Sequence, residues 1–156
     1  MAQEAASYTA PETVAALHLE RTFTAPREEV FRAWTDPQAM TQWFGSRFMR
    51  KPDAEADVRV GGRYRITMKS RTGWTFHCVG TYVEVEPPER LVYTFSWENM
   101  GALTPGMGDS LVTVEFRDLD GSTEVHLTHE LRDSRWLRGF HHWGWRRSLD
   151  NLERLL

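Results

Sequence analysis

The 156-residue sequence predicts one domain of the α+β class, with an antiparallel sheet of about six strands, two short helices after the first strand and a long C-terminal helix. Three observations support this prediction. Apolar residues alternate with polar ones in six segments. Proline and carboxylate signals for two helix starts follow the first of these segments, and residues 134–156 carry an apolar stripe at helical spacing. Residues 1–15 follow neither period, so we expect a flexible tail before a single domain over 16–156.

Local signals predict the first strand and the two short helices. In residues 16–24, apolar side chains fall on one face of a half-buried strand. Pro26 suits the first turn of a helix over 26–35. Asp36-Pro37 then ends that helix and starts another over 37–44, with Asp36 as its N-cap and Gly45 closing it. The apolar stripes of the two helices are Val30, Phe31 and Trp34, then Met40, Trp43 and Phe44.

Five further strands and one helix follow. The charged segment 46–57 is predicted to be irregular, and the glycine-rich segment 99–109 to be a mobile loop. The strands are expected from Gly61-Gly62 through Met68, before a turn at Gly73, and over 74–86, 90–98, 111–117 and 123–131. Short turns join most of them, so they should pair as antiparallel neighbours. The final helix carries Trp145, Leu149, Leu152 and Leu156 on one face.

Composition excludes several classes of protein. Lysine and arginine number 19 against 22 acidic residues, a net charge of −3, which argues against nucleic-acid binding. The single cysteine, Cys78, excludes an internal disulfide and a zinc site of several cysteines. No apolar run is long enough to predict a membrane span, and the N-terminus lacks a signal peptide, so we expect a cytoplasmic protein. No phosphate-binding glycine motif is present, and we predict no cofactor.

Seven tryptophans, eight phenylalanines and four tyrosines could line a ligand cavity or simply fill a core. Strand parity turns many of them toward the C-terminal helix. Aromatic side chains with a polar tip suit a flat, mostly apolar ligand that needs one or two hydrogen bonds. The residues predicted to line the cavity are Trp34, Tyr64, Ile66, Met68, His77, Tyr93, Phe95, Trp97, Val112, Val114, His129, Phe140, Trp143 and Arg147.

Some of these residues have two interpretations. His77 and His129 are both predicted to point inward. They could be a polar pair that orients a ligand or moves a proton, or they could be two core histidines with a structural role only. Arg147 could reach a ligand carboxylate or lie on a solvated helix face. The pairs His126/His129 and His141-His142 diverge in direction, so no metal site is predicted.

The outer face of the strand over 74–86 has its own predictions. Cys78 is predicted to point outward and to be inert. Phe76 and Tyr82, also expected to point outward, could join Trp74 in a homodimer contact; a monomer remains the alternative.

Several segments, in this order and spacing, resemble a known family. They are Arg21–Pro26, Val30–Pro37, Gln42–Phe44, Gly61–Arg65, Gly80–Leu91 and Gly144-Trp145 with Leu149 and Leu152. The sequence resembles the START-like, or birch-pollen-allergen-like, helix-grip superfamily (SRPBCC), in the branch of homologues of the activator of heat-shock protein 90 ATPase. The resemblance implies that the sheet curls around the C-terminal helix, that the two short helices support the far end, and that a hydrophobic cavity lies between them.

The resemblance leaves three functions open. The leading hypothesis is the binding of a small hydrophobic or aromatic molecule in the internal cavity. The second is a cyclase- or hydratase-type enzyme that uses the same cavity. The third is a co-chaperone or stress-response module. The eukaryotic co-chaperone has a separate N-terminal chaperone-binding domain, for which residues 1–15 are too short, and this weighs against a chaperone partner and ATPase activation.

Overall fold

A seven-stranded antiparallel sheet wraps around a long helix in the computed structural model, which describes residues 8, 10, 14–45, 49–103 and 107–156. The strands are β1 (Val14–Phe23), β2 (Asp53–Ala56), β3 (Arg63–Lys69), β4 (Thr75–Glu86), β5 (Arg90–Glu98), β6 (Ser110–Asp118) and β7 (Thr123–Arg132). The helices are α1 (Arg27–Thr35), α2 (Pro37–Trp43), the short 3-10 helix η1 (Gly101–Leu103) and α4 (Arg135–Leu155). The strand order is β1-β7-β6-β5-β4-β3-β2. The predicted α+β class and the antiparallel pairing are confirmed.

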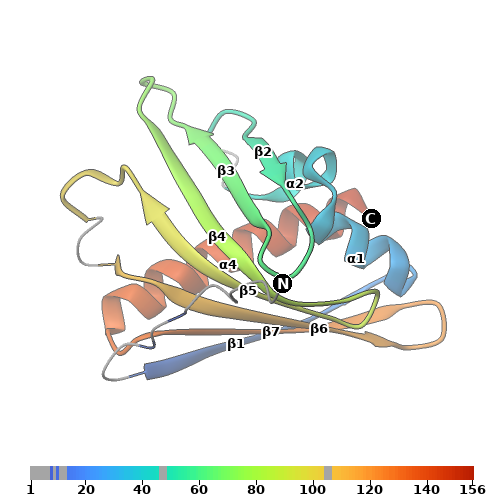
Figure 1. Ribbon diagram of the computed structural model, residues 1–156. Helices are drawn as coiled ribbons and strands as arrows, with labels where there is room; N and C mark the ends of the chain where they lie inside the picture. The colour runs from blue at the N-terminus through green and yellow to red at the C-terminus, as the bar shows by residue number, and fades with distance from the viewer. Residues whose placement is uncertain (1–7, 9, 11–13, 46–48, 104–106) are drawn as a thin grey trace.

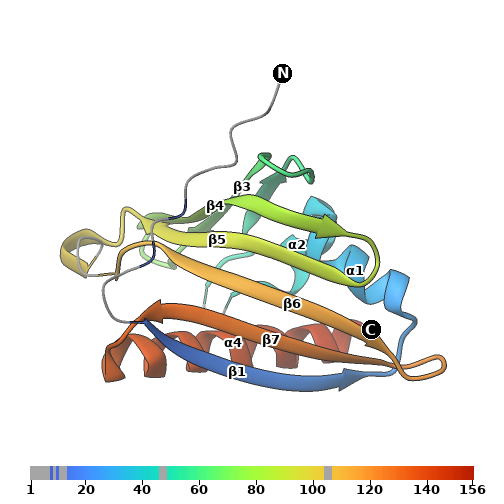
Figure 2. The same ribbon diagram turned by 60° about the horizontal axis from the view of Figure 1, so that its bottom comes forward.

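Figures 1 and 2 show the sheet curling around α4, with α1 and α2 at the end where α4 finishes. Side-chain caps begin α2 and α4, and the one at Asp36 was predicted. The Asp36 carboxylate accepts a hydrogen bond from the Gln38 N–H at 3.0 Å, and Pro37 begins α2. Ser134 caps α4 in the same way, accepting from the Leu137 N–H at 3.3 Å.

The end of α2 is tied to α4 by hydrogen bonds. Gly45 has a φ of 96°, a conformation that glycine adopts without strain. Its N–H donates to Ser148 Oγ at 3.1 Å, and the Asn151 side-chain amide donates to its carbonyl at 2.9 Å. These bonds hold the Trp43-Phe44-Gly45 segment against the inner face of the long helix.

Strand β2 was missed in the predicted irregular segment 46–57. Its four residues alternate carboxylates with alanines, so no large apolar side chain marks a buried face. It lies at the edge of the sheet and pairs only with β3. The loop expected over 99–109 includes residues 104–106, outside the described residues; on either side of them, Met100 and Met107 are buried.

The predicted faces of β4 are wrong. Residues opposite one another in an antiparallel pair share a face, and Ile66 pairs with Cys78 while Met68 pairs with Phe76. The even-numbered residues of β4 from Phe76 to Tyr82 therefore point inward. Tyr82 also lies inward, only 3% exposed, just before a register shift of the β-bulge type. The prediction failed because β4 carries apolar residues on both faces, so alternation does not say which is buried.

This correction also changes the surface. Phe76 and Tyr82 are buried and provide no homodimer contact, whereas Trp74 remains 44% exposed. Cys78 is fully buried, not outward-facing, and burial raises the pKa of its thiol, which disfavours the reactive thiolate.

The core lies between α4 and the concave face of the sheet. The predicted stripe on α4 is confirmed for Trp145, Leu149 and Leu152, which are almost fully buried. Arg21, the polar exception on the inner face of β1, donates to Asp150 at 2.9 Å and to Glu153 at 3.0 Å. An arginine therefore stands on the apolar side of β1 because it pairs with carboxylates near the end of α4.

Candidate functional site

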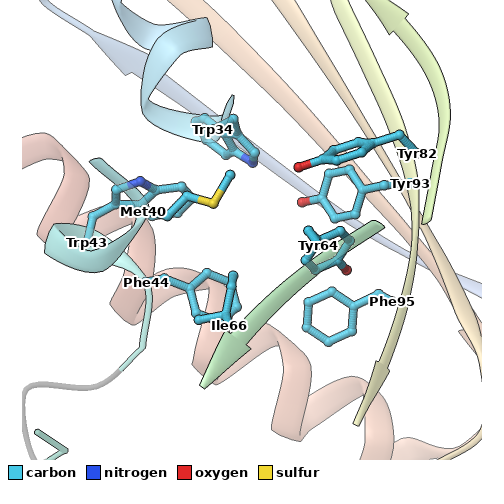
Figure 3. A pocket seen from close by; sticks show the side chains of 9 residues that line it. All are labelled: Trp34, Met40, Trp43, Phe44, Tyr64, Ile66, Tyr82, Tyr93 and Phe95. Atoms are coloured by element: carbon cyan, nitrogen blue, oxygen red, sulfur yellow. The ribbon is translucent and has the colours of Figure 1, made fainter. Parts of the chain in front are cut away.

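Two neighbouring chambers lie inside the curled sheet. The inner chamber has a volume of about 20 Å³ and lies beneath α1 and α2 (Figure 3); its lining residues are Trp34, Met40, Trp43, Phe44, Tyr64, Ile66, Tyr82, Tyr93 and Phe95. The outer chamber has a volume of about 170 Å³; its lining residues are Phe44, Gly45, Met49, Met68, Phe76, Phe95, Trp97, Met100, Phe140, His141, Trp143, Gly144, Trp145 and Ser148. Phe44 and Phe95 belong to both linings, so these two rings stand between the chambers.

Three polar groups converge in the inner chamber. Trp34 comes from α1, Tyr82 from β4 and Tyr93 from β5, and Figure 3 shows the indole nitrogen and the two hydroxyls turned toward one another. Trp34 Nε1 is buried beside the Tyr93 hydroxyl, where it opposes the rise in that group's pKa, but it completes no hydrogen bond of normal geometry with a described residue. Burial raises the pKa of Tyr82 and of Tyr93, so both phenols stay protonated near neutral pH. The inner chamber therefore offers neutral hydrogen-bond donors.

The third tyrosine of the inner chamber is already engaged. The Tyr64 hydroxyl donates to the Thr94 carbonyl at 2.6 Å. Gly80 makes this geometry possible, because a Cβ at that position would lie 1.8 Å from the Thr94 carbonyl oxygen and 2.6 Å from the Tyr64 ring. The glycine lets β4, the Thr94 carbonyl and the tyrosine ring approach one another closely.

The outer chamber is apolar and partly open. Its walls are mainly aromatic rings and methionines, and Trp143, 49% exposed, stands at its rim. In the part of the chain that the structure describes, no lysine or arginine lines either chamber. A buried anion would find no cationic partner there, so this lining favours neutral molecules.

Two histidines beside the outer chamber have both ring nitrogens engaged. Trp145 Nε1 donates to His129 Nδ1 at 3.0 Å, so the His129 proton lies on Nε2, which faces Ser110 Oγ at 2.7 Å. The Ser110 hydroxyl donates onward to the Phe95 carbonyl at 2.8 Å. His141 accepts from Trp97 Nε1 at 3.1 Å and donates through Nδ1 to the Leu137 carbonyl at 2.8 Å.

Both histidines form all of their ring hydrogen bonds in the neutral state. Burial, and next the neighbouring His141, hold the pKa of His129 well below its usual value. Burial also lowers the pKa of His141, although its bond to the Leu137 carbonyl opposes the shift. Neither ring has a free nitrogen to exchange a proton with a ligand in this arrangement. The two residues serve to fix Trp97 and Trp145 in the chamber wall.

Nine of the residues predicted from the sequence line a chamber. Trp34, Tyr64, Ile66 and Tyr93 line the inner one, Phe95 lines both, and Met68, Trp97, Phe140 and Trp143 line the outer one.

Five predicted residues do not line a chamber. His77 lies on the opposite face of β4, where its Nδ1 is 3.0 Å from Thr67 Oγ1. Val112 and Val114 are fully buried in the core, and His129 is enclosed behind Trp145. Arg147 is exposed and stands over the Trp143 ring, its Cζ atom 5.6 Å from the centroid, and it lines neither chamber.

Several lining residues were missed. Phe76 and Tyr82 were lost through the wrong parity of β4. Trp43 and Phe44 belonged to a recognised helix stripe, but nothing in the sequence placed that helix over the chamber. Met49, Met100 and His141 have no sequence signal, because their positions depend on how loops and α4 meet in three dimensions.

The described residues contain no group of three histidine, cysteine or carboxylate side chains that could hold a metal ion. Within the same residues, no helix is both long and apolar enough to cross a membrane.

A curled antiparallel sheet that grips a long C-terminal helix, with an apolar chamber between them, defines a helix-grip protein. The family described as Activator of Hsp90 ATPase homolog 1-like protein matches residues 24–156. The chain belongs to this family, as the sequence resemblance predicted. Among curated proteins, none is similar enough to count as a match.

Solved structures share the fold over nearly the whole chain. A Rhizobium leguminosarum protein is 30% identical, with a TM-score of 0.76, over 90% of this chain and 93% of its own. Protein CV1439 of Chromobacterium violaceum is 26% identical, with a TM-score of 0.76, over 91% of this chain and 97% of its own. The AHSA1 (SPO3351) protein of Silicibacter pomeroyi is 24% identical, with a TM-score of 0.74, over 90% of this chain and 96% of its own, a likeness of fold.

Proposed function

We propose that this protein binds a small, neutral, hydrophobic or aromatic molecule in the outer chamber. The observation that carries the proposal is the apolar volume of about 170 Å³ between the sheet and α4. An apolar cavity of about 150 Å³ in another protein binds benzene, so a molecule with one six-membered ring has the matching size. The aromatic walls favour a flat ring through edge and face contacts.

The state of the histidines favours binding over catalysis. A cyclase or hydratase needs an acid or base within reach of its substrate. His77 lies on the outer face, and the ring nitrogens of His129 and His141 already have partners. Burial also keeps the inner tyrosines protonated. These side chains suit the wall of a binding site.

A glycine on α4 provides a sharp test. Gly144 lines the outer chamber, on the helix face that also carries Phe140 and Ser148, and a Cβ there meets no atom within 4 Å. Gly144→Leu should fill the chamber and weaken the binding of isopropenylbenzene, an apolar ring compound, by at least about tenfold. Binding is measured by calorimetric titration.

The control is Gly139→Leu on the same helix. Gly139 is exposed, has the same open space around a Cβ, and does not line the chamber. This variant should bind isopropenylbenzene like the wild type. The proposal fails if the wild type binds no apolar ring compound, or if the two leucine variants bind equally well.

A further inference from the structure

The inner chamber contains a cluster of buried polar atoms. An apolar molecule bound only in the outer chamber would make no use of them. Trp34, Tyr82 and Tyr93 are each at least nine-tenths buried, and their polar atoms converge (Figure 3). The Trp34 Nε1–H lies close enough to the Tyr93 hydroxyl to oppose the rise in that group's pKa, but it completes no hydrogen bond of normal geometry with a described residue. A buried donor without a partner costs about 1–3 kcal/mol, so such a group normally has an acceptor. An acceptor therefore belongs in this chamber.

Size and chemistry restrict that acceptor. The volume of about 20 Å³ admits one oxygen-sized group, since one water needs about 10–15 Å³. An indole N–H can only donate, and a protonated phenol donates readily. A carbonyl oxygen has two lone pairs, which match the Trp34 N–H and one tyrosine O–H.

We infer that the inner chamber binds the carbonyl oxygen of a neutral ketone, ester or amide whose apolar ring occupies the outer chamber. This inference rests on the proposed function, because it assigns the polar end of the same ligand. A carboxylate is disfavoured because no described lysine or arginine lines either chamber. Phe44 and Phe95 stand between the chambers, so a ligand arm passes beside these two rings.

A series of methyl phenyl ketones tests the inference. Zero, one or two methylene groups separate the ring from the carbonyl, and each ketone is paired with the alkene in which CH₂ replaces the oxygen. Because ketone and alkene have the same shape, their affinity ratio isolates the oxygen. At the arm length that fits, the ketone should bind about tenfold more tightly, which is the upper end of one neutral hydrogen bond. The phenyl carboxylate of matching length should bind more weakly than either.

Two variants test whether the carbonyl oxygen of the ketone binds in the inner chamber. Tyr93→Phe keeps the ring and its packing but removes the hydroxyl, and Trp34→Phe removes the indole N–H. Each should reduce the ketone-to-alkene ratio, and the infrared C=O stretch of the bound ketone should move toward its value in a non-hydrogen-bonding solvent. Trp136→Phe is the control: its exposed ring stacks on Phe140 in the outer chamber wall, where ketone and alkene place the same phenyl ring, so it should change neither the ketone-to-alkene ratio nor the C=O stretch.

The outcomes separate the inference from the proposed function. If ketones and alkenes bind with equal affinity at every arm length, ring binding stands and the carbonyl site is wrong. The carbonyl site is also wrong if the chamber holds a water that stays in place when the ketone binds. If neither ketones nor alkenes bind, the proposed function itself fails.

Discussion

Single buried side chains decide what the interior can bind. His129 and His141 could have been a proton-transfer pair, but each ring nitrogen has a partner that fixes a neutral tautomer. Their role is to hold indole rings in the chamber wall. The Trp34 Nε1 and the hydroxyls of Tyr82 and Tyr93 beside it are the polar groups that we propose for a ligand.

The two histidines make stability depend on pH. Their pKa values are lowered in the folded state, whereas an unfolded histidine titrates at about pH 6.5. Below about pH 6.5 the unfolded chain binds more protons at these histidines than the folded protein does. The free energy of unfolding therefore falls as the pH drops. Each histidine contributes at most about 1.4 kcal/mol per pH unit, until its own lowered pKa is reached. Above that window the two histidines contribute no slope.

Urea unfolding at a series of pH values measures this slope. His129→Gln replaces the ring with a group that does not titrate, and it should flatten the curve below about pH 6.5 even though the variant is less stable overall. His142→Gln on α4, at a residue that is only half-buried, is the control. An unchanged slope in His129→Gln would show that His129 is not the source of acid sensitivity.

At the scale of elements, β4 shapes the inner chamber. Gly80 is needed because a Cβ would meet the Thr94 carbonyl oxygen, part of the neighbouring backbone, which cannot rotate away. Gly80→Ala should destabilise the protein by about 2 kcal/mol, a typical cost of overpacking. Gly144→Ala should instead stabilise the protein by about 0.5–1 kcal/mol, because it adds a helix-favouring residue in open space. Thermal and urea unfolding measure both, and equal effects would contradict this explanation.

The elements that were predicted correctly are determined by residues close together in the sequence. The Asp36-Pro37 cap, the α4 stripe and the alternation in β3, β5, β6 and β7 can each be read from neighbouring residues. The features that were predicted wrongly depend on contacts between segments that are far apart in the sequence. The faces of β4 are set by its pairing with β3, and β2 exists only because an edge of the sheet was available to it. For the same reason, the sequence located the lining residues on α1, β3 and β5 and two of those on α4, but missed those supplied by β4, α2 and the loops.

For the whole molecule, the chamber results from the way a curled sheet meets a straight helix. Helix α4 packs against β1, β7 and α2. Where it passes β4 and β5, the aromatic rings that face it leave about 170 Å³ unfilled. The hydrogen bonds from Ser148 and Asn151 to the end of α2 hold one wall in place. In the ligand that we propose, the inner chamber takes the polar end and the outer chamber the apolar body.

A crystal of the protein soaked in bromobenzene tests the central claim most directly. The bromine atom gives an anomalous signal that locates the ring without reference to the expected site. We expect one dominant peak inside the outer chamber, among Phe76, Trp97 and Phe140. A peak only on the outer surface, or none at a saturating concentration, would contradict the proposal that this interior binds an apolar ring.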